Sequence, residues 1–159
     1  DVGFHVWGND NTVRWGQGGM LDDIDDTTFG HDGDEGGGSK LNLDIHGDDN
    51  KVAGVQRNGS ANAWSGHTAT VYIYADENEV WVNQNTDGVK TFTMTSRTDE
   101  NSVSVEQTGN AAHTGTITLT GSSPTTLNLT QQSNTAQSYS LTQNCVTVGG
   151  CSVSVTQGQ

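Results

Sequence analysis

The segment DENEVWVNQ, residues 76–84, has three further copies in the chain, all aligned without gaps. They are NDNTVRWGQ (residues 9–17), DDNKVAGVQ (48–56) and DENSVSVEQ (99–107). Each copy has Asn at its third position, Val two residues later and Gln at its end. Self-similarity at a spacing of some tens of residues is the signature of repeat architectures such as solenoids, and these four copies indicate one.

The recurring residues stand at even offsets from one another, and side chains at even offsets point to one face of a β-strand. The odd positions hold Thr, Lys, Glu, Ser and Arg, which belong in water. Two degenerate copies end at Gln131 and Gln157 and keep the Val or Leu and the Gln, but not the Asn. The predicted inner face therefore contains Asn11, Val13, Gln17, Asn50, Val52, Gln56, Asn78, Val80, Gln84, Asn101, Val103, Gln107, Gln131 and Gln157.

A second alternating run lies upstream of each copy, as in Leu41, Leu43 and Ile45. Turn-forming residues such as Gly47 and Asp48 separate the two runs. Each repeat thus reads as strand, short arc, strand and longer connection, and no segment has helical periodicity. The sequence predicts an all-β chain that folds as a β-solenoid of about six stacked strand-arc-strand coils.

Composition explains why the coils have to stack. Only 30% of the 159 residues are hydrophobic, too few for an ordinary core of Leu, Ile and Phe. Parallel stacking at about 4.8 Å places Asn on Asn and Gln on Gln, so each amide donates to one neighbouring copy and accepts from the other. We therefore expect one amyloid-like domain over residues 1–159, in which amide ladders replace part of the apolar core.

The repeat resembles that of the curlins, the bacterial curli subunits, which runs Ser, five residues, Gln-x-Gly-x-x-Asn-x-Ala, three residues, Gln. Gly8, Asn11 and Gln17 keep the Gly, Asn and Gln of this pattern, as do the matching residues that end at Gln56. The family's Ala is Val in the four best copies, and its first Gln is Val6, Ile45, Ile73 or Ser96. The resemblance covers about six coils, nearly the whole chain, as a divergent member.

The resemblance implies a non-enzymatic, secreted subunit that polymerises end to end into amyloid-like biofilm fibres. It also implies other copies of the chain as the main partner, together with a nucleator subunit and a secretion channel. The chain begins at Asp1 without a basic and apolar leader, which indicates either a processed, secreted chain or an expressed segment.

The net charge of −13 makes nucleic acid an unsuitable partner, because its phosphates would be repelled. No stretch approaches the roughly 18 apolar residues that a membrane span needs. Cys145 and Cys151 lie close together in sequence, and in a secreted chain we expect them to form a disulfide.

Residues 18–40 interrupt the repeat with an acidic, Gly-rich insertion. Carboxylates are hard oxygen ligands of the kind that calcium prefers, and the glycines permit tight turns. The spacing does not match an EF-hand loop, so a solvated acidic insertion without a cofactor is the alternative interpretation. The candidate calcium ligands are Asp22, Asp23, Asp25, Asp26, Asp32 and Asp34, with Glu35 beside them.

Aromatic and histidine residues have weaker patterns. Trp15 falls on the predicted inner face, whereas Trp7 and Trp81 fall on outward positions and suit binding or lateral packing. The five histidines show no metal-ligand spacing, and we expect them on the surface or in loops. No nucleophile and base arrangement is specified, so we expect no catalysis.

A fibre subunit is the function that the repeat favours. The alternative is an ice- or glycan-binding solenoid or adhesin module. Rows of outward threonines, Thr91-x-Thr93-x-Thr95 and Thr116-x-Thr118-x-Thr120, support ice binding, although the first three coils are expected to lack such a row.

Overall fold

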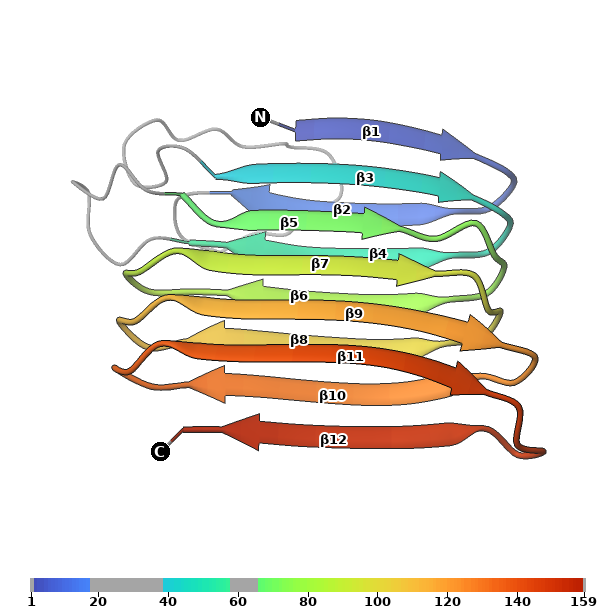
Figure 1. Cartoon of the computed structure of the whole chain (residues 1–159). Coiled ribbons are helices and arrows are strands. Elements are labelled where there is room, and N and C mark those ends of the chain that lie inside the picture. Colours follow the sequence, from blue (N-terminus) through green and yellow to red (C-terminus); the bar gives the residue numbers. More distant parts are fainter. Residues whose placement is uncertain (1, 18–38, 58–65, 159) are drawn as a thin grey trace.

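The computed structural model describes residues 2–17, 39–57 and 66–158, all of which form strands, arcs and connections without a helix. The first sheet has the strand order β1-β3-β5-β7-β9-β11 and the second β12-β10-β8-β6-β4-β2 (Figure 1). The strands of the first sheet are β1 (Val2–Trp7), β3 (Lys40–His46), β5 (Thr68–Tyr72), β7 (Lys90–Ser96), β9 (His113–Gly121) and β11 (Gln137–Cys145). The strands of the second are β2 (Thr12–Gln17), β4 (Lys51–Gln56), β6 (Glu79–Gln84), β8 (Ser102–Thr108), β10 (Thr125–Gln132) and β12 (Cys151–Gln157).

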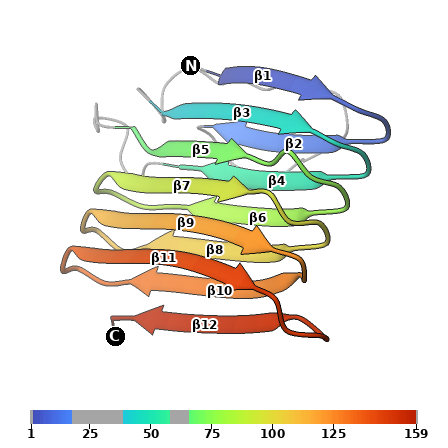
Figure 2. The same cartoon turned by 45° about the vertical axis from the view of Figure 1, so that its right-hand side comes forward.

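Each coil is one odd-numbered strand, an arc and the following even-numbered strand, so the chain alternates between the two sheets (Figure 2). All pairings between consecutive coils are parallel. The architecture is therefore a β-solenoid of stacked strand-arc-strand coils, as the repeat predicts. No helix in the described part of the chain is long and apolar enough to cross a membrane.

The register keeps equivalent repeat positions in contact. Val52 pairs with Val80 and Val80 with Val103, while Gln56 pairs with Gln84 and Gln84 with Gln107. The pairing continues into the degenerate copies, where Gln131 pairs with Gln107 on one side and Gln157 on the other. Insertions of different length are consequently confined to the connections outside the strands.

The inner faces of the two sheets meet in a continuous apolar core. The first-sheet side contributes Leu41, Leu43, Ile45, Val71, Ile73, Phe92, Met94, Ile117 and Leu119, and the second sheet contributes Val52, Val80, Val82, Val103, Val105, Leu127 and Leu129, all buried. Trp15 is also inward and buried, and it fits because its partner in the next coil is Gly54. A Cβ atom at Gly54 would lie only 2.3 Å from Trp15 Cζ3.

The first four arcs turn the chain by the same local device. Asp10, Asp49, Glu77 and Glu100 occupy equivalent positions and have φ values of 53°, 55°, 56° and 58°. This left-handed conformation is uncommon for residues other than Gly, Asn and Asp. Its recurrence places the backbone N–H of Glu77 3.0 Å from the Asp48 carbonyl and that of Asp49 3.0 Å from the Asn9 carbonyl, which ties neighbouring arcs together.

Candidate functional site: amide ladders and end coils

A glutamine ladder runs along the inner face of the second sheet. Gln56 Nε2 donates to Gln84 Oε1, and Gln84 Nε2 donates to Gln107 Oε1, both at 2.8 Å. The same 2.8 Å step joins Gln107 to Gln131 and Gln131 to Gln157. Each of these Nε2 groups also donates to a backbone carbonyl of the first sheet, those of Lys40, Thr68, Thr91, Thr114 and Ser138. The ladder therefore links consecutive coils and also links the two sheets.

The asparagine column stabilises the arcs in a different way. Asn50 Oδ1 accepts the backbone N–H of Asn78, and Asn78 Oδ1 accepts that of Asn101, at 3.0 and 2.9 Å. The Nδ2 groups donate mainly to arc carbonyls, for example from Asn50 to Ala75 at 2.8 Å. The expectation that amides stack on amides thus holds from Gln56 to Gln157 in the Gln column, but among the described residues of the Asn column it holds only between Asn50 and Asn78. The shorter Asn side chain lies close to the arc backbone and forms most of its hydrogen bonds with backbone groups there.

The two ladders end at different coils. The Asn column starts at Asn11, whose Oδ1 accepts the N–H of Asn50, and ends where Asn101 Oδ1 accepts the N–H of Thr125. Cys151 is paired with Thr125 and offers no amide. The Gln column continues one coil further, to Gln157. Only the backbone of Gln17 is described, and it pairs with Gln56 in register with the ladder.

The end coils leave inward side chains uncovered. Tyr139, Leu141, Val153 and Val155 of the sixth coil pack against the core but are only partly buried, and so is Val13 of the first coil. Their equivalents in the middle coils are buried. The inner face is thus incomplete at both ends of the stack.

A buried polar column that the sequence did not predict lies at the start of the first-sheet strands. Lys90 pairs with His113, and His113 pairs with Gln137. His67 directly precedes Thr68, which pairs with Thr91, so it occupies the same column. His67, Lys90 and His113 are 0% exposed. The expectation that the histidines lie on the surface or in loops is therefore wrong for His113, and His67 lies in a connection but is buried. It holds for His5, which is exposed, and for the partly exposed His46, while His31 lies outside the described residues.

Lys90 is held by backbone carbonyls. Its Nζ lies 2.6 Å from Asp87 O, 3.0 Å from Gly88 O, 2.7 Å from Gly109 O and 2.8 Å from Ala111 O. Burial lowers the pKa of Lys90 to about 8, opposed by the smaller effect of the Asp87 carboxylate. Four acceptors favour the ammonium form. At neutral pH this ammonium group therefore ties the third connection between coils, which contains Asp87 and Gly88, to the fourth, which contains Gly109 and Ala111.

The neighbouring imidazoles are suited to the neutral form. His67 Nδ1 accepts the backbone N–H of Lys90 at 3.1 Å, and Nε2 lies 2.6 Å from the Arg57 carbonyl, so the proton belongs on Nε2. His113 Nε2 lies 2.7 Å from the Thr108 carbonyl. Burial lowers the pKa of both imidazoles, and the charge of Lys90 lowers it further. The sequence did contain a signal for these two buried histidines. His67 and His113 stand two residues before the inward positions Ala69 and Gly115, and side chains at even offsets in a strand point to the same face.

The arcs carry a third column, made of carboxylates. Asp48 Oδ1 accepts the N–H of Asn9 at 2.6 Å, and Asp76 Oδ1 accepts that of Asp48 at 2.8 Å. Asp99 continues the column by accepting the N–H of Asp76 at 3.0 Å. The column stops there, because the fifth arc has Ser122 and Ser123 instead of acids.

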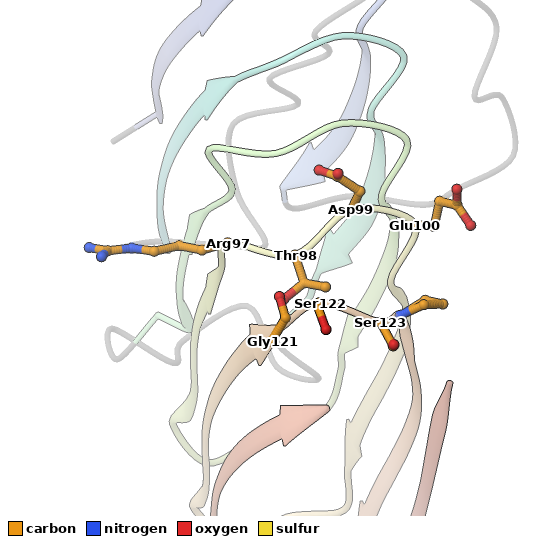
Figure 3. Close-up of a pocket in the computed structure, with 8 residues that line it drawn as sticks. Arg97, Thr98, Asp99, Glu100, Gly121, Ser122 and Ser123 are labelled. Carbon is orange, nitrogen blue, oxygen red and sulfur yellow. The ribbon is translucent and has the colours of Figure 1, made fainter. Parts of the chain in front are cut away.

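A hollow of about 200 Å³ lies where this column stops (Figure 3). Its lining comes from the fourth and fifth arcs and consists of Arg97, Thr98, Asp99, Glu100, Gly121, Ser122, Ser123 and Pro124. Figure 3 shows the Arg97 side chain pointing away from the serines. No group of three or more His, Cys, Asp or Glu side chains suited to a metal is found in residues 2–17, 39–57 and 66–158. The proposed calcium ligands Asp22, Asp23, Asp25, Asp26, Asp32 and Asp34 lie outside the described residues.

Cys145 and Cys151 form a disulfide with a Cα–Cα separation of 5.9 Å across the sixth arc. The bond closes the base of this arc, where the last strand of each sheet begins or ends. Val146 and Val148 lie inside the closed loop and are 66% and 99% exposed.

Exposed aromatic residues cluster on the outside of the first three coils, where the strands of the first sheet lead into the arcs. Trp7 is 63% exposed and packs edge-on against His46 at 4.3 Å, and His46 packs against Tyr74 at 4.6 Å. Asp44 joins the cluster by accepting a hydrogen bond from Tyr74 and by lying 3.0 Å from His46 Nε2. Trp81 lies apart on the second sheet and is exposed, so both indoles are outward as expected.

Comparisons with protein-family models, curated proteins and solved structures found no match to this chain.

The glutamine ladder predicts a clear contrast between two adjacent residues. Replacing Gln131 by Leu removes the acceptor for Gln107 and the donor to Gln157, at a cost of about 1–3 kcal/mol for each orphaned group. Thermal unfolding followed by circular dichroism should show a melting temperature lower by several degrees. The control is Gln132→Leu, whose side chain is exposed on the same strand and should change little. Equal melting of both variants would contradict a stabilising ladder.

The buried histidines predict a loss of stability in acid. Their folded-state pKa values lie below the 6.5 of the ordinary imidazole, so stability is complete above that value and falls as the pH drops through it. The double variant His67→Gln, His113→Gln should lose fewer degrees of melting temperature between pH 7 and pH 5 than the wild type. Gln is the natural residue of this column at Gln137. His5→Gln, at an exposed position, serves as control, and an unchanged pH dependence in the double variant would refute the assignment.

Proposed function

We propose that the chain is a structural subunit of an extracellular, amyloid-like fibre that grows by head-to-tail stacking of solenoids. The supporting observation is that both ends of the stack are open in the part of the chain that the structure describes. Among the described strands, β1 and β2 each pair with one other strand, as do β11 and β12, so each end presents unpaired backbone groups. Such edges are templates for pairing with another chain.

The inner faces of the two ends suit each other. The partly buried Leu141 and Val155 at one end need an apolar cover, and Val13 of the first coil is equally uncovered at the other. Gln157 donates to Ser138 O, and no coil follows it among the described residues. A second copy placed in register would bring Gln17 to the next position of the glutamine ladder.

The charge distribution favours head-to-tail contact. Every Asp, Glu, Lys and Arg of the chain lies at or before Glu106, and residues 107–159 have none. Two N-terminal ends would bring acidic arcs together, whereas an N-terminal end against a C-terminal end meets an uncharged surface. A contact that uses two different surfaces and does not close extends into a filament.

The remaining features of the proposal follow from the curlin resemblance. It assigns a role in biofilm matrix or adhesion without catalysis, and it includes a nucleator subunit and a secretion channel as partners. The disulfide Cys145–Cys151 supports an oxidising compartment outside the cell.

Fibre formation is tested directly on the purified chain. Protein left to stand should form filaments visible by negative-stain electron microscopy, with a meridional X-ray reflection near 4.7–4.8 Å and binding of amyloid dyes. Salt or calcium should accelerate growth because both screen the acidic arcs. A chain that stays monomeric from pH 4 to pH 8, with and without calcium, would refute the proposal.

Ice binding is the second candidate function, supported by the outer face of the first sheet. Thr70, Thr93, Thr116 and Ser140 are consecutive in register, flanked by the column Thr68, Thr91, Thr114 and Ser138. The third coil therefore does contain a Thr-x-Thr row, contrary to the expectation that the first three coils lack one. Strand spacing fixes these hydroxyls and methyls in a regular lattice of about 4.8 by 6.7 Å.

A thermal hysteresis assay on the monomer tests this second function. An ice-binding face should give hysteresis that is abolished by Thr93→Lys with Thr116→Lys, because lysines disrupt the lattice. Thr126→Lys, on the outer face of β10 in the second sheet, should leave hysteresis intact. Wild-type protein without hysteresis would remove ice binding from consideration.

A further inference from the structure

We propose that the sixth arc, residues 146–150, is a docking element that covers Trp7 of the next copy in the fibre. This inference rests on the proposed function, since it names the residues of the head-to-tail joint. In this contact, the exposed Val146 and Val148 at the C-terminal end of one copy pack against the exposed Trp7 at the N-terminal end of the next copy.

The register places both groups at the same corner of the coil. Trp7 pairs with His46, and at the opposite end Thr120 pairs with Asn144. Tyr74 and Arg97 occupy the intermediate coils, because Tyr72 pairs with Thr95 and Ser96 pairs with Leu119. One outward column therefore runs from Trp7 to Asn144 along the whole stack. In a head-to-tail fibre the next residue of the column after Asn144 is Trp7 of the following copy.

Trp7 is covered on one side only. Within its own chain it contacts His46 of the second coil at 4.3 Å and stacks with His5 at 6.4 Å, yet it stays 63% exposed. The uncovered side faces the end of the stack, because no described coil precedes β1. A large apolar side chain in this position is suited to burial in a joint.

The sixth arc extends toward the position where that indole would lie. Three residues separate Gly121 from Thr125 in the fifth coil, whereas residues 146–150 separate the paired Cys145 and Cys151 in the sixth. Both views show this arc extending beyond the start of β12, down to the level of that last strand (Figures 1 and 2). An arc that only closed the last coil would not need this extension.

The exposed surface of the arc has the chemistry of a contact with an indole. Val146 and Val148 are 66% and 99% exposed, and the Cys145–Cys151 disulfide restricts the loop that presents them. No Asp, Glu, Lys or Arg occurs anywhere in residues 107–159, so the arc brings no charge of its own into the contact. An apolar partner is therefore the one that this arc fits.

Seeded elongation of fibres tests the joint. Trp7→Ala and Val148→Asp should each raise the critical monomer concentration about tenfold, because each removes the burial of a large apolar group. The double variant should be little worse than either single variant, since both remove one contact. The melting temperature of the Val148→Asp monomer should stay unchanged, because Val148 is 99% exposed, and that of Trp7→Ala should fall only slightly, because the indole loses its contact with His46.

Two matched controls separate this contact from general effects. Trp81→Ala removes another exposed indole, and Val89→Asp adds the same charge at another exposed valine, away from both ends of the stack. Neither control should change elongation. Wild-type fibres together with unaffected Trp7→Ala and Val148→Asp variants would overturn the docking element but leave the proposed fibre function standing. Failure of the wild type to form fibres would overturn both.

Discussion

The structure depends on in-register stacking of identical side-chain amides. A Gln side chain can donate to the next coil and accept from the previous one only if every coil has Gln at the same position along its strand and if the spacing between coils is constant. This condition fixes strand register, because a slip of one residue would move the amide to the solvent face. It also explains why the strands keep similar lengths while the connections differ: residues 18–38 and 58–65 lie between strands that still pair in register.

The same condition allows a polar interior. Gln56, Gln84, Gln107 and Gln131 are all 0% exposed, and each donates to a carbonyl of the opposite sheet. Gln84, Gln107 and Gln131 also bond to the Gln on both sides, whereas Gln56 bonds to Gln84 and accepts from Trp15 Nε1. Buried polar groups with complete hydrogen bonding carry little penalty, and they specify alignment more strictly than apolar residues do. Lys90 obeys the same rule with carbonyl acceptors, which is why a lysine is tolerated inside the solenoid.

The repeat in the sequence predicted the fold well because it encodes one face of one strand. Even offsets placed Asn, Val and Gln together, and the alternating upstream run placed Leu43 and Ile45 in the opposite sheet. The buried His67, Lys90 and His113 were missed because they differ from each other and so do not register as a repeat. Their shared feature is position, which becomes visible only when the coils are aligned by their strands. The different roles of the Asn and Gln ladders were also hidden, because side-chain length matters only once the arc is in place.

At the ends of the stack, the two corners of a coil differ in the interactions they offer to a following chain. At the corner between the second sheet and the following connection, the glutamine ladder reaches the last coil, so an identical chain can extend it with the same hydrogen bond. At the arc corner the Asn column has already ended at Thr125. The side chain of Cys151 has no amide oxygen to accept the backbone N–H of a following coil. A continuous stack therefore needs another source of free energy at the arc corner. The uncharged, disulfide-closed sixth arc stands at this corner, where repulsion between acidic arcs would otherwise be strongest. The apolar loop that stands in the last coil in place of acids and amides thus removes the electrostatic repulsion between arcs, while the glutamine ladder maintains the strand register.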